Sequence, residues 1–203
     1  MKKNKFLKDK YLIIRDFVPK NISKFLFSYF VNKRTTSQHL FLTKYISPFE
    51  KIFGTFGDSQ IENKKTFCMY GDIAIDTLLY NSLSSLSKSL DMELFPTYSF
   101  GRIYSQGDEL HKHKDRPSCE ISATVNLGGD PWPIFLKDTN KKNVEITLNP
   151  GDILMYKGAD LEHWRKPFLG KICAQVFLHY TTNKKNIYDG RPMLGLPPYF
   201  KSK

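Results

Sequence analysis

The chain has 203 residues, of which 40% are hydrophobic and 14% aromatic, and these values suit one globular domain and exclude a disordered or fibrous protein. No apolar stretch approaches membrane-spanning length, and none follows the basic N-terminus as in a secretion signal. Cys68, Cys119 and Cys173 are irregularly spaced, which fits neither a disulfide framework nor a Cys-x-x-Cys zinc site. We therefore expect a soluble, cytoplasmic protein without membrane partners.

The formal net charge is +11, and a basic surface gains affinity for nucleic acid by releasing counterions from phosphates. However, the lysines are spread through the chain and are not interleaved with aromatic residues as in a nucleic-acid-binding module. We interpret the charge as a solvated basic surface that would tolerate an acidic partner or substrate.

The first half of the chain predicts one strand and two helices. Residues 11–18 are typical of a strand that stops at a proline, and a helix follows over 21–31. Leucines at spacings of three to four residues predict an amphipathic helix over 76–90. The region 35–65 has no clean period, so we expect loops there, either a substrate lid or a structural insertion.

After Pro96 the pattern changes to short strands separated by turns rich in Gly, Asn, Asp and Pro. The predicted strands span 97–105, 120–127, 132–137, 144–148, 152–156 and 171–181. This order predicts a mainly β protein with a jelly-roll core and flanking helices. We expect a single domain over 1–203, with the strand and helices in 11–95, the core in 97–182 and a C-terminal extension over 183–203.

A His-x-Asp pair is the clearest chemical motif. In an extended strand His113 and Asp115 project to the same side, so both can bind one metal while Lys114 points away. His163, fifty residues later, supplies a second imidazole, and antiparallel jelly-roll topology can bring such distant segments to one mouth of the barrel. Two imidazoles and one carboxylate are the ligand set of a mononuclear non-haem iron site, which leaves positions open for a cosubstrate and dioxygen.

Other histidines are weaker candidates. His111 has the same spacing to His113 but supplies no carboxylate, so we expect an exposed or supporting role. His179 falls late in the last predicted strand, where a satisfied core or edge histidine is expected, and His39 has no chemical partner in view. A degenerate barrel that binds no metal is the alternative.

The ordered set of residues resembles the Fe(II)- and 2-oxoglutarate-dependent dioxygenases, in particular their prolyl 4-hydroxylase-like branch, whose fold is a double-stranded β-helix related to the cupins. The resemblance runs from about residue 11 to 182 and is carried by Tyr104, residues 113–117, His163 and residues 170–171 and 177–180. The chain is also similar to a group of small hydroxylases found in microbes and their viruses, and a viral protein of this kind would act in the host cytoplasm.

The resemblance implies Fe(II), 2-oxoglutarate and dioxygen as metal and cosubstrates. In that family a basic residue on the final strand, nine or ten positions beyond the distal His, pairs with the far carboxylate of 2-oxoglutarate. Lys171 is eight beyond His163, and we favour it on register over Arg165, which has the better bidentate geometry. The tyrosine hydroxyl that the family places near the cosubstrate corresponds to Tyr104.

Further residues follow from strand parity. Gln175 shares a face with Lys171, and Thr124 lies on the opposed strand, so both could share the cosubstrate pocket. Arg116 either holds the substrate or braces Asp115.

The implied reaction hydroxylates an unactivated C–H bond and releases succinate and carbon dioxide. The branch suggests a prolyl or other amino-acid side chain, in a peptide, a protein or a small amino-acid-like substrate. An AlkB-type nucleic-acid demethylase would share the metal ligands, but it normally carries two arginines six apart after the distal His, and only Arg165 and Lys171 have that spacing here. A non-catalytic cupin-like binding module is the third alternative.

Overall fold

Two antiparallel sheets face each other in the computed structural model of this chain, which describes residues 2–47, 50–61, 65–187, 189, 191 and 193–196. The larger sheet contains, in spatial order, β1 (Tyr11–Ile14), β9 (Ile153–Tyr156), β6 (Ile121–Gly129), β11 (Ile172–Thr181), β4 (Phe95–Ser105), β3 (Phe67–Tyr70) and β2 (Thr55–Phe56). The smaller sheet contains β5 (Leu110–His113), β10 (His163–Arg165), β7 (Ile134–Lys137) and β8 (Asn143–Ile146). The expected mainly β, jelly-roll core is confirmed.

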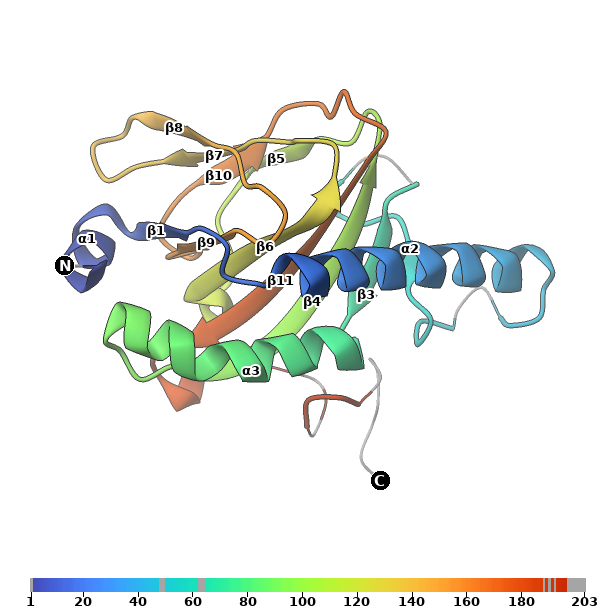
Figure 1. Cartoon of the computed structure of the whole chain (residues 1–203), viewed down its shortest axis with the longest axis horizontal. Coiled ribbons are helices and arrows are strands. Elements are labelled where there is room, and N and C mark those ends of the chain that lie inside the picture. Colours follow the sequence, from blue (N-terminus) through green and yellow to red (C-terminus); the bar gives the residue numbers. More distant parts are fainter. Residues whose placement is uncertain are drawn as a thin grey trace.

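Helices cover the outer face of the larger sheet, as Figure 1 shows. The covering helices are α2 (Lys20–Leu42) and α3 (Ile73–Leu90), and α1 (Lys2–Asp9) packs against β1 and α3. The chain also forms the short 3-10 turns η1 (Pro117–Cys119) and η2 (Lys184–Asn186). In Figure 1, α2 runs across the strands and continues beyond the edge of the sheet. The smaller sheet lies on the opposite side, so the larger sheet has helices on one face and a second sheet on the other.

Several predicted boundaries are wrong for tertiary reasons. α2 continues to Leu42, so residues 35–42 are helical and not loop; the projecting half of the helix covers little of the sheet, and its sequence therefore shows no apolar stripe. β1 ends at Ile14, because the chain turns at Asp16, whose φ is 49°. The short strands β2, β3, β5 and β10 and the helix α1 were not predicted.

Strand alternation sorts the residues of β4 between two environments. Gly101 and Ile103 face the helices, and Ile103 belongs to the main apolar core between the larger sheet, α2 and α3. Arg102 and Tyr104 face the other way, toward the smaller sheet. On β4, the side toward the smaller sheet therefore carries polar and aromatic side chains, whereas near β7, β8 and β9 the space between the sheets is filled by a second, mainly aliphatic cluster.

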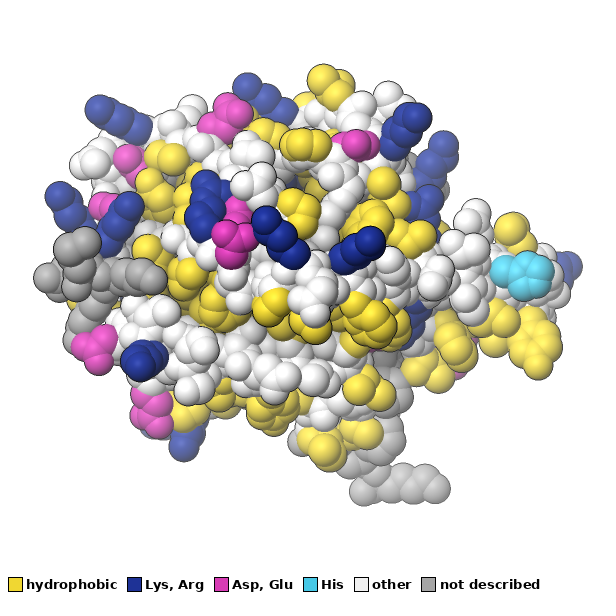
Figure 2. Space-filling model, in the orientation of Figure 1, with side chains coloured by type: hydrophobic (Ala, Val, Ile, Leu, Met, Phe, Trp, Pro, Cys, Tyr) yellow, Lys and Arg dark blue, Asp and Glu magenta, His cyan; other side chains and the backbone are white. Residues whose placement is uncertain are grey.

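Charged side chains are distributed over the surface. Figure 2 shows Lys and Arg side chains spread over one face of the molecule, with acidic side chains among them. No helix in the described part of the chain combines the length and the apolar character needed to cross a membrane.

Gly101 gives a test of the packing under α2. A Cβ atom there would lie 2.6 Å from ring atoms of Phe30 and 2.9 Å from Cδ1 of Ile75. We expect Gly101→Ala to lower the free energy of unfolding by roughly 1–3 kcal/mol through overpacking, measured as a lower urea midpoint. In a Phe30→Leu background, Gly101→Ala should lower the free energy of unfolding by less than it does in the wild type. Strictly additive effects of the two changes would contradict the packing account.

Candidate metal centre and its cavity

The three predicted metal ligands lie together. His113 ends β5 and His163 begins β10, and the two residues pair directly across these antiparallel strands. Asp115 follows β5, and its Oδ1 lies 3.7 Å from Nε2 of His113 and 3.5 Å from Nε2 of His163. The three ligand atoms lie within 4.8 Å of one another. This is a compact group of two nitrogens and one oxygen that one metal ion could join.

Both imidazoles are held in the tautomer that a metal requires. Nδ1 of His113 lies 2.8 Å from the carbonyl oxygen of His111, and Nδ1 of His163 lies 2.9 Å from that of Leu161. A carbonyl only accepts, so each Nδ1 carries the hydrogen and each Nε2 presents a lone pair. Burial, followed by the charge of His163, lowers the pKa of His113, which favours the neutral, metal-binding form.

Asp115 is fixed by its neighbours and stays ionised. Ser122 donates a hydrogen bond of 2.6 Å to Oδ2, and the backbone N–H of Asp115 donates to the carbonyl of Gly158 at 2.9 Å. Burial alone would raise the pKa of Asp115, but His163, His179 and the Ser122 hydroxyl together outweigh it and hold the pKa well below its usual range. The carboxylate is therefore available as an anionic ligand at neutral pH.

A cavity of about 640 Å³ surrounds this group. It lies between the two sheets and is lined by the three candidate ligands, by aromatic side chains and by three arginines, Arg102, Arg116 and Arg165. Tyr156, at the end of β9, is a further wall residue that packs edge-on against His163, with 4.8 Å between the ring centroids. The cavity is large enough for a small ligand beside a metal ion.

Arg165 is the unusual charge in this cavity. It is 1% exposed, and it projects to the same side as His163 because the two are separated by one residue on β10. Its guanidinium donates to Oε1 of Gln175 at 2.6 Å and to the carbonyl of Trp132, whereas its Nε has no partner. Among the described residues no carboxylate pairs with it, and burial lowers its pKa. A buried cation without an anion is costly, so the site suits an anionic ligand.

Lys171, which was predicted in this pocket, lies outside it. Lys171 is exposed and is not among the residues that line the cavity. It lies in the turn before β11, where its backbone N–H donates to Oδ2 of Asp130 at 2.6 Å. The first residue of β11 that faces the smaller sheet is thus Cys173, whereas Arg165 reaches the cavity from β10 of the other sheet.

The remaining predicted residues are divided between the depth and the rim of the site. Tyr104 is fully buried and packs against Trp132, and Gln175 holds Arg165. Thr124 is buried on β6, and its hydroxyl has no partner. Arg116 lies at the rim, where its Nε donates to the Tyr98 hydroxyl at 3.2 Å and its guanidinium lies 4.5 Å from the centre of the Tyr98 ring.

Sequence reasoning missed Arg102. Its Nη2 donates to Oδ2 of Asp58 at 2.8 Å and to Oε1 of Gln60 at 2.7 Å, so its charge, unlike that of Arg165, is already neutralised. The parity that selected Tyr104 also places Arg102 on the inner face of β4, and this signal could have found it. Its partners come from the region without a sequence period and could not be predicted.

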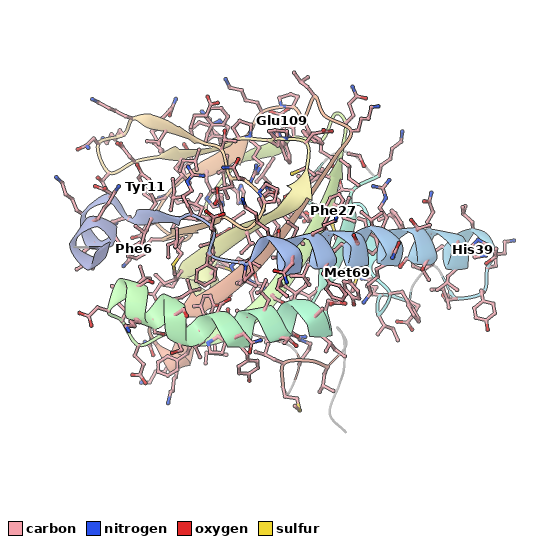
Figure 3. All side chains as sticks on the ribbon, in the orientation of Figure 1. Phe6, Tyr11, Phe27, His39, Met69 and Glu109 are labelled. Atoms are coloured by element: carbon pink, nitrogen blue, oxygen red, sulfur yellow. The ribbon has the colours of Figure 1, made fainter. Side chains whose placement is uncertain are left out.

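The weaker histidines fall in different places. His39 lies near the projecting end of α2, far from the two sheets, as its label in Figure 3 shows. His111 is exposed on β5 and contributes its carbonyl to His113. His179 is buried as expected, but it also lines the cavity.

The Gly158 position tests how Asp115 is held. A side chain at Gly158 would meet Oδ2 of Asp115, so we expect Gly158→Ala to displace the carboxylate and weaken Co(II) or Fe(II) binding about 10-fold or more. Gly170→Ala is the matched control, since its Cβ would be equally crowded by Phe168 and Asp130 but lies away from the ligands. Isothermal titration should show weaker metal binding in the first variant alone, and equal losses in both would contradict this account.

Comparisons with known proteins agree on the fold. No protein-family model and no curated protein matches the chain by sequence. HygX from Streptomyces hygroscopicus, with nickel, 2-oxoglutarate and hygromycin B bound, matches with a TM-score of 0.67 at 11% identity, over 98% of this chain and 95% of that one. A Pseudomonas putida prolyl-4-hydroxylase matches with a TM-score of 0.66 at 10% identity, over 88% and 96%.

A prolyl hydroxylase from Trichoplax adhaerens, in complex with a peptide fragment of the hypoxia inducible factor oxygen degradation domain, matches with a TM-score of 0.62 at 17% identity, over 92% and 89% of the two chains. The expected double-stranded β-helix fold is therefore confirmed. The candidate His113, Asp115 and His163 site lies inside that fold.

Proposed function

We propose that this chain, whose fold is that of the Fe(II)- and 2-oxoglutarate-dependent oxygenases, is an enzyme of that kind and hydroxylates a C–H bond. One observation carries the proposal: two imidazoles and one carboxylate converge in the same cavity as a buried arginine that has no carboxylate partner among the described residues. When bound, Fe(II) supplies the activation of dioxygen that couples decarboxylation of 2-oxoglutarate, to succinate and carbon dioxide, with hydroxylation of the substrate.

The residues in the cavity fit both groups. His113, Asp115 and His163 would hold Fe(II), since their ligand atoms lie within 4.8 Å of one another and Nδ1 of each imidazole is occupied by a backbone carbonyl. Three protein ligands leave open positions for a chelating cosubstrate. Nε of Arg165, which has no partner among the described residues, is a polar atom that a ligand would satisfy.

Arg165 is the proposed partner for the distal carboxylate of 2-oxoglutarate. Arg165 is buried, has no described carboxylate partner and lies two residues after His163. Lys171 is exposed, and Arg102 is already paired with Asp58. A guanidinium also binds a carboxylate through two parallel hydrogen bonds. Gln175 orients the guanidinium, and Tyr104 and Thr124 complete the polar surroundings.

The substrate would enter the part of the cavity that is lined by Tyr70 and Tyr98. Tyr70 and Tyr98 stack there with ring centroids 5.2 Å apart, and Arg116 and Lys114 lie at the rim. Aromatic and basic side chains together support a peptide substrate with an acidic group nearby, and a prolyl side chain is the first candidate for hydroxylation. The protein would bind the substrate against the aromatic wall, orient its C–H bond toward the metal and exclude water.

The exposure of Lys171 weakens the demethylase alternative, since the pair with Arg165 that suggested it does not form in the cavity.

The first test is an anaerobic titration of the apoprotein with Fe(II) and then 2-oxoglutarate. We expect a visible metal-to-ligand charge-transfer band in the wild type and none in His163→Ala, because loss of one imidazole removes a metal ligand. Circular dichroism of the variant controls for folding. An iron-loaded wild type without the band would refute the cosubstrate assignment and favour a non-catalytic binding module.

A second test separates the two basic residues after His163. We expect Arg165→Gln to raise the Kd for 2-oxoglutarate by at least about 30-fold, since removing one partner of a buried charge pair costs 2 kcal/mol or more. Lys171→Gln should leave this Kd unchanged. Titrating the charge-transfer band measures both values, and the opposite ranking of the two variants would return the role to Lys171.

A further inference from the structure

A chain of hydrogen bonds leads from Asp115 into the wall of the cavity. Oγ of Ser122 lies 2.6 Å from Oδ2 of Asp115 and 3.1 Å from Nδ1 of His179. Ser122 on β6 and His179 on β11 are direct partners in the sheet. A serine hydroxyl has one hydrogen and an ionised carboxylate only accepts, so Ser122 donates to Asp115 and accepts from Nδ1–H of His179.

The ring of His179 is held from its other side. It packs against Tyr98 with 4.6 Å between ring centroids, and it lies within 4.8 Å of the thiol of Cys119. The Tyr98 hydroxyl lies 3.0 Å from Sγ of Cys119 and receives a hydrogen bond from Arg116. These contacts fix the position of His179 and, through it, the direction of the Ser122 hydroxyl.

We propose that Ser122 and His179 are positioning residues for the carboxylate ligand, an inference that rests on the proposed metal centre. They hold Oδ2 of Asp115 away from the cavity centre, so that Oδ1 faces Nε2 of both His113 and His163. The missing side chain at Gly158 provides the room for Oδ2. A carboxylate held in this way occupies one coordination position of the metal and leaves the others free for ligands.

Ser122→Ala and Ser99→Ala form a matched pair for the test. Both serines are 0% exposed, and each donates a hydrogen bond of 2.6 Å to an aspartate, Ser122 to Asp115 and Ser99 to Asp76. Both variants should lose similar thermal stability. Only Ser122→Ala should weaken Co(II) binding, by about 10- to 100-fold, and change the visible Co(II) spectrum, because Asp115 becomes free to bind through both oxygens.

His179 is tested by rescue. His179→Leu removes the donor to Ser122 and should weaken Co(II) binding as Ser122→Ala does. His179→Asn supplies an amide N–H near the position of Nδ1 and should recover most of the affinity. Wild-type affinity and spectrum in Ser122→Ala would overturn the proposal, as would equal binding by the Leu and Asn variants of His179.

Co(II) binding needs no substrate and no turnover, so the two proposals can fail separately. A wild type that binds no divalent metal would overturn both. A wild type that binds one ion, with an unchanged Ser122→Ala variant, would overturn only the positioning role. Two Zn(II) ions per chain, one of them lost in Cys119→Ser, would make Asp115, Cys119 and His179 a second metal site and would overturn the positioning role as well.

Discussion

The antiparallel pairing of β5 with β10 is the contact on which the candidate centre depends. It places His113 opposite His163, although fifty residues separate them in the chain. A shift of one residue in this register would turn one imidazole to the outer face of the smaller sheet. The backbone hydrogen bonds between β5 and β10 therefore determine the relative positions of the two imidazoles.

The two buried arginines of the cavity differ in how their charge is compensated. Arg102 is paired inside the protein with Asp58, and Arg165 is not paired with any described carboxylate. The first arrangement stabilises the folded chain itself. The second leaves a cost that a bound anion removes, so an anionic ligand at this position would stabilise the fold as well as occupy the site.

The pairing of His113 with Asp115 could be predicted because the signal is local: the two residues share a side in any extended strand. Lys171 lies outside the cavity because β11 begins at Ile172 and Lys171 stays in the preceding turn, which a register counted along the chain does not reveal. Parity applied to His163 places Arg165 on the cavity side, as the structure has it.

The rest depends on contacts that a sequence does not display. Asp58 reaches Arg102 from a region without periodicity, and α2 extends past the sheet where no apolar pattern marks it. The hydrogen bonds from His179 through Ser122 to Asp115 join three segments that only the folded sheets bring together.

The three-residue strand β10 carries both His163 and Arg165, and this has a consequence for ligand length. Their Cα atoms are about 7 Å apart, because each residue of a strand advances the chain by 3.2–3.4 Å. A diacid that bridged the metal and the guanidinium would have to match this spacing, which the pairing of β10 with β5 and with β7 holds in place. Shorter diacids would not reach the guanidinium, and longer ones would have to bend to fit. The proposed binding of 2-oxoglutarate would therefore favour a diacid of one chain length.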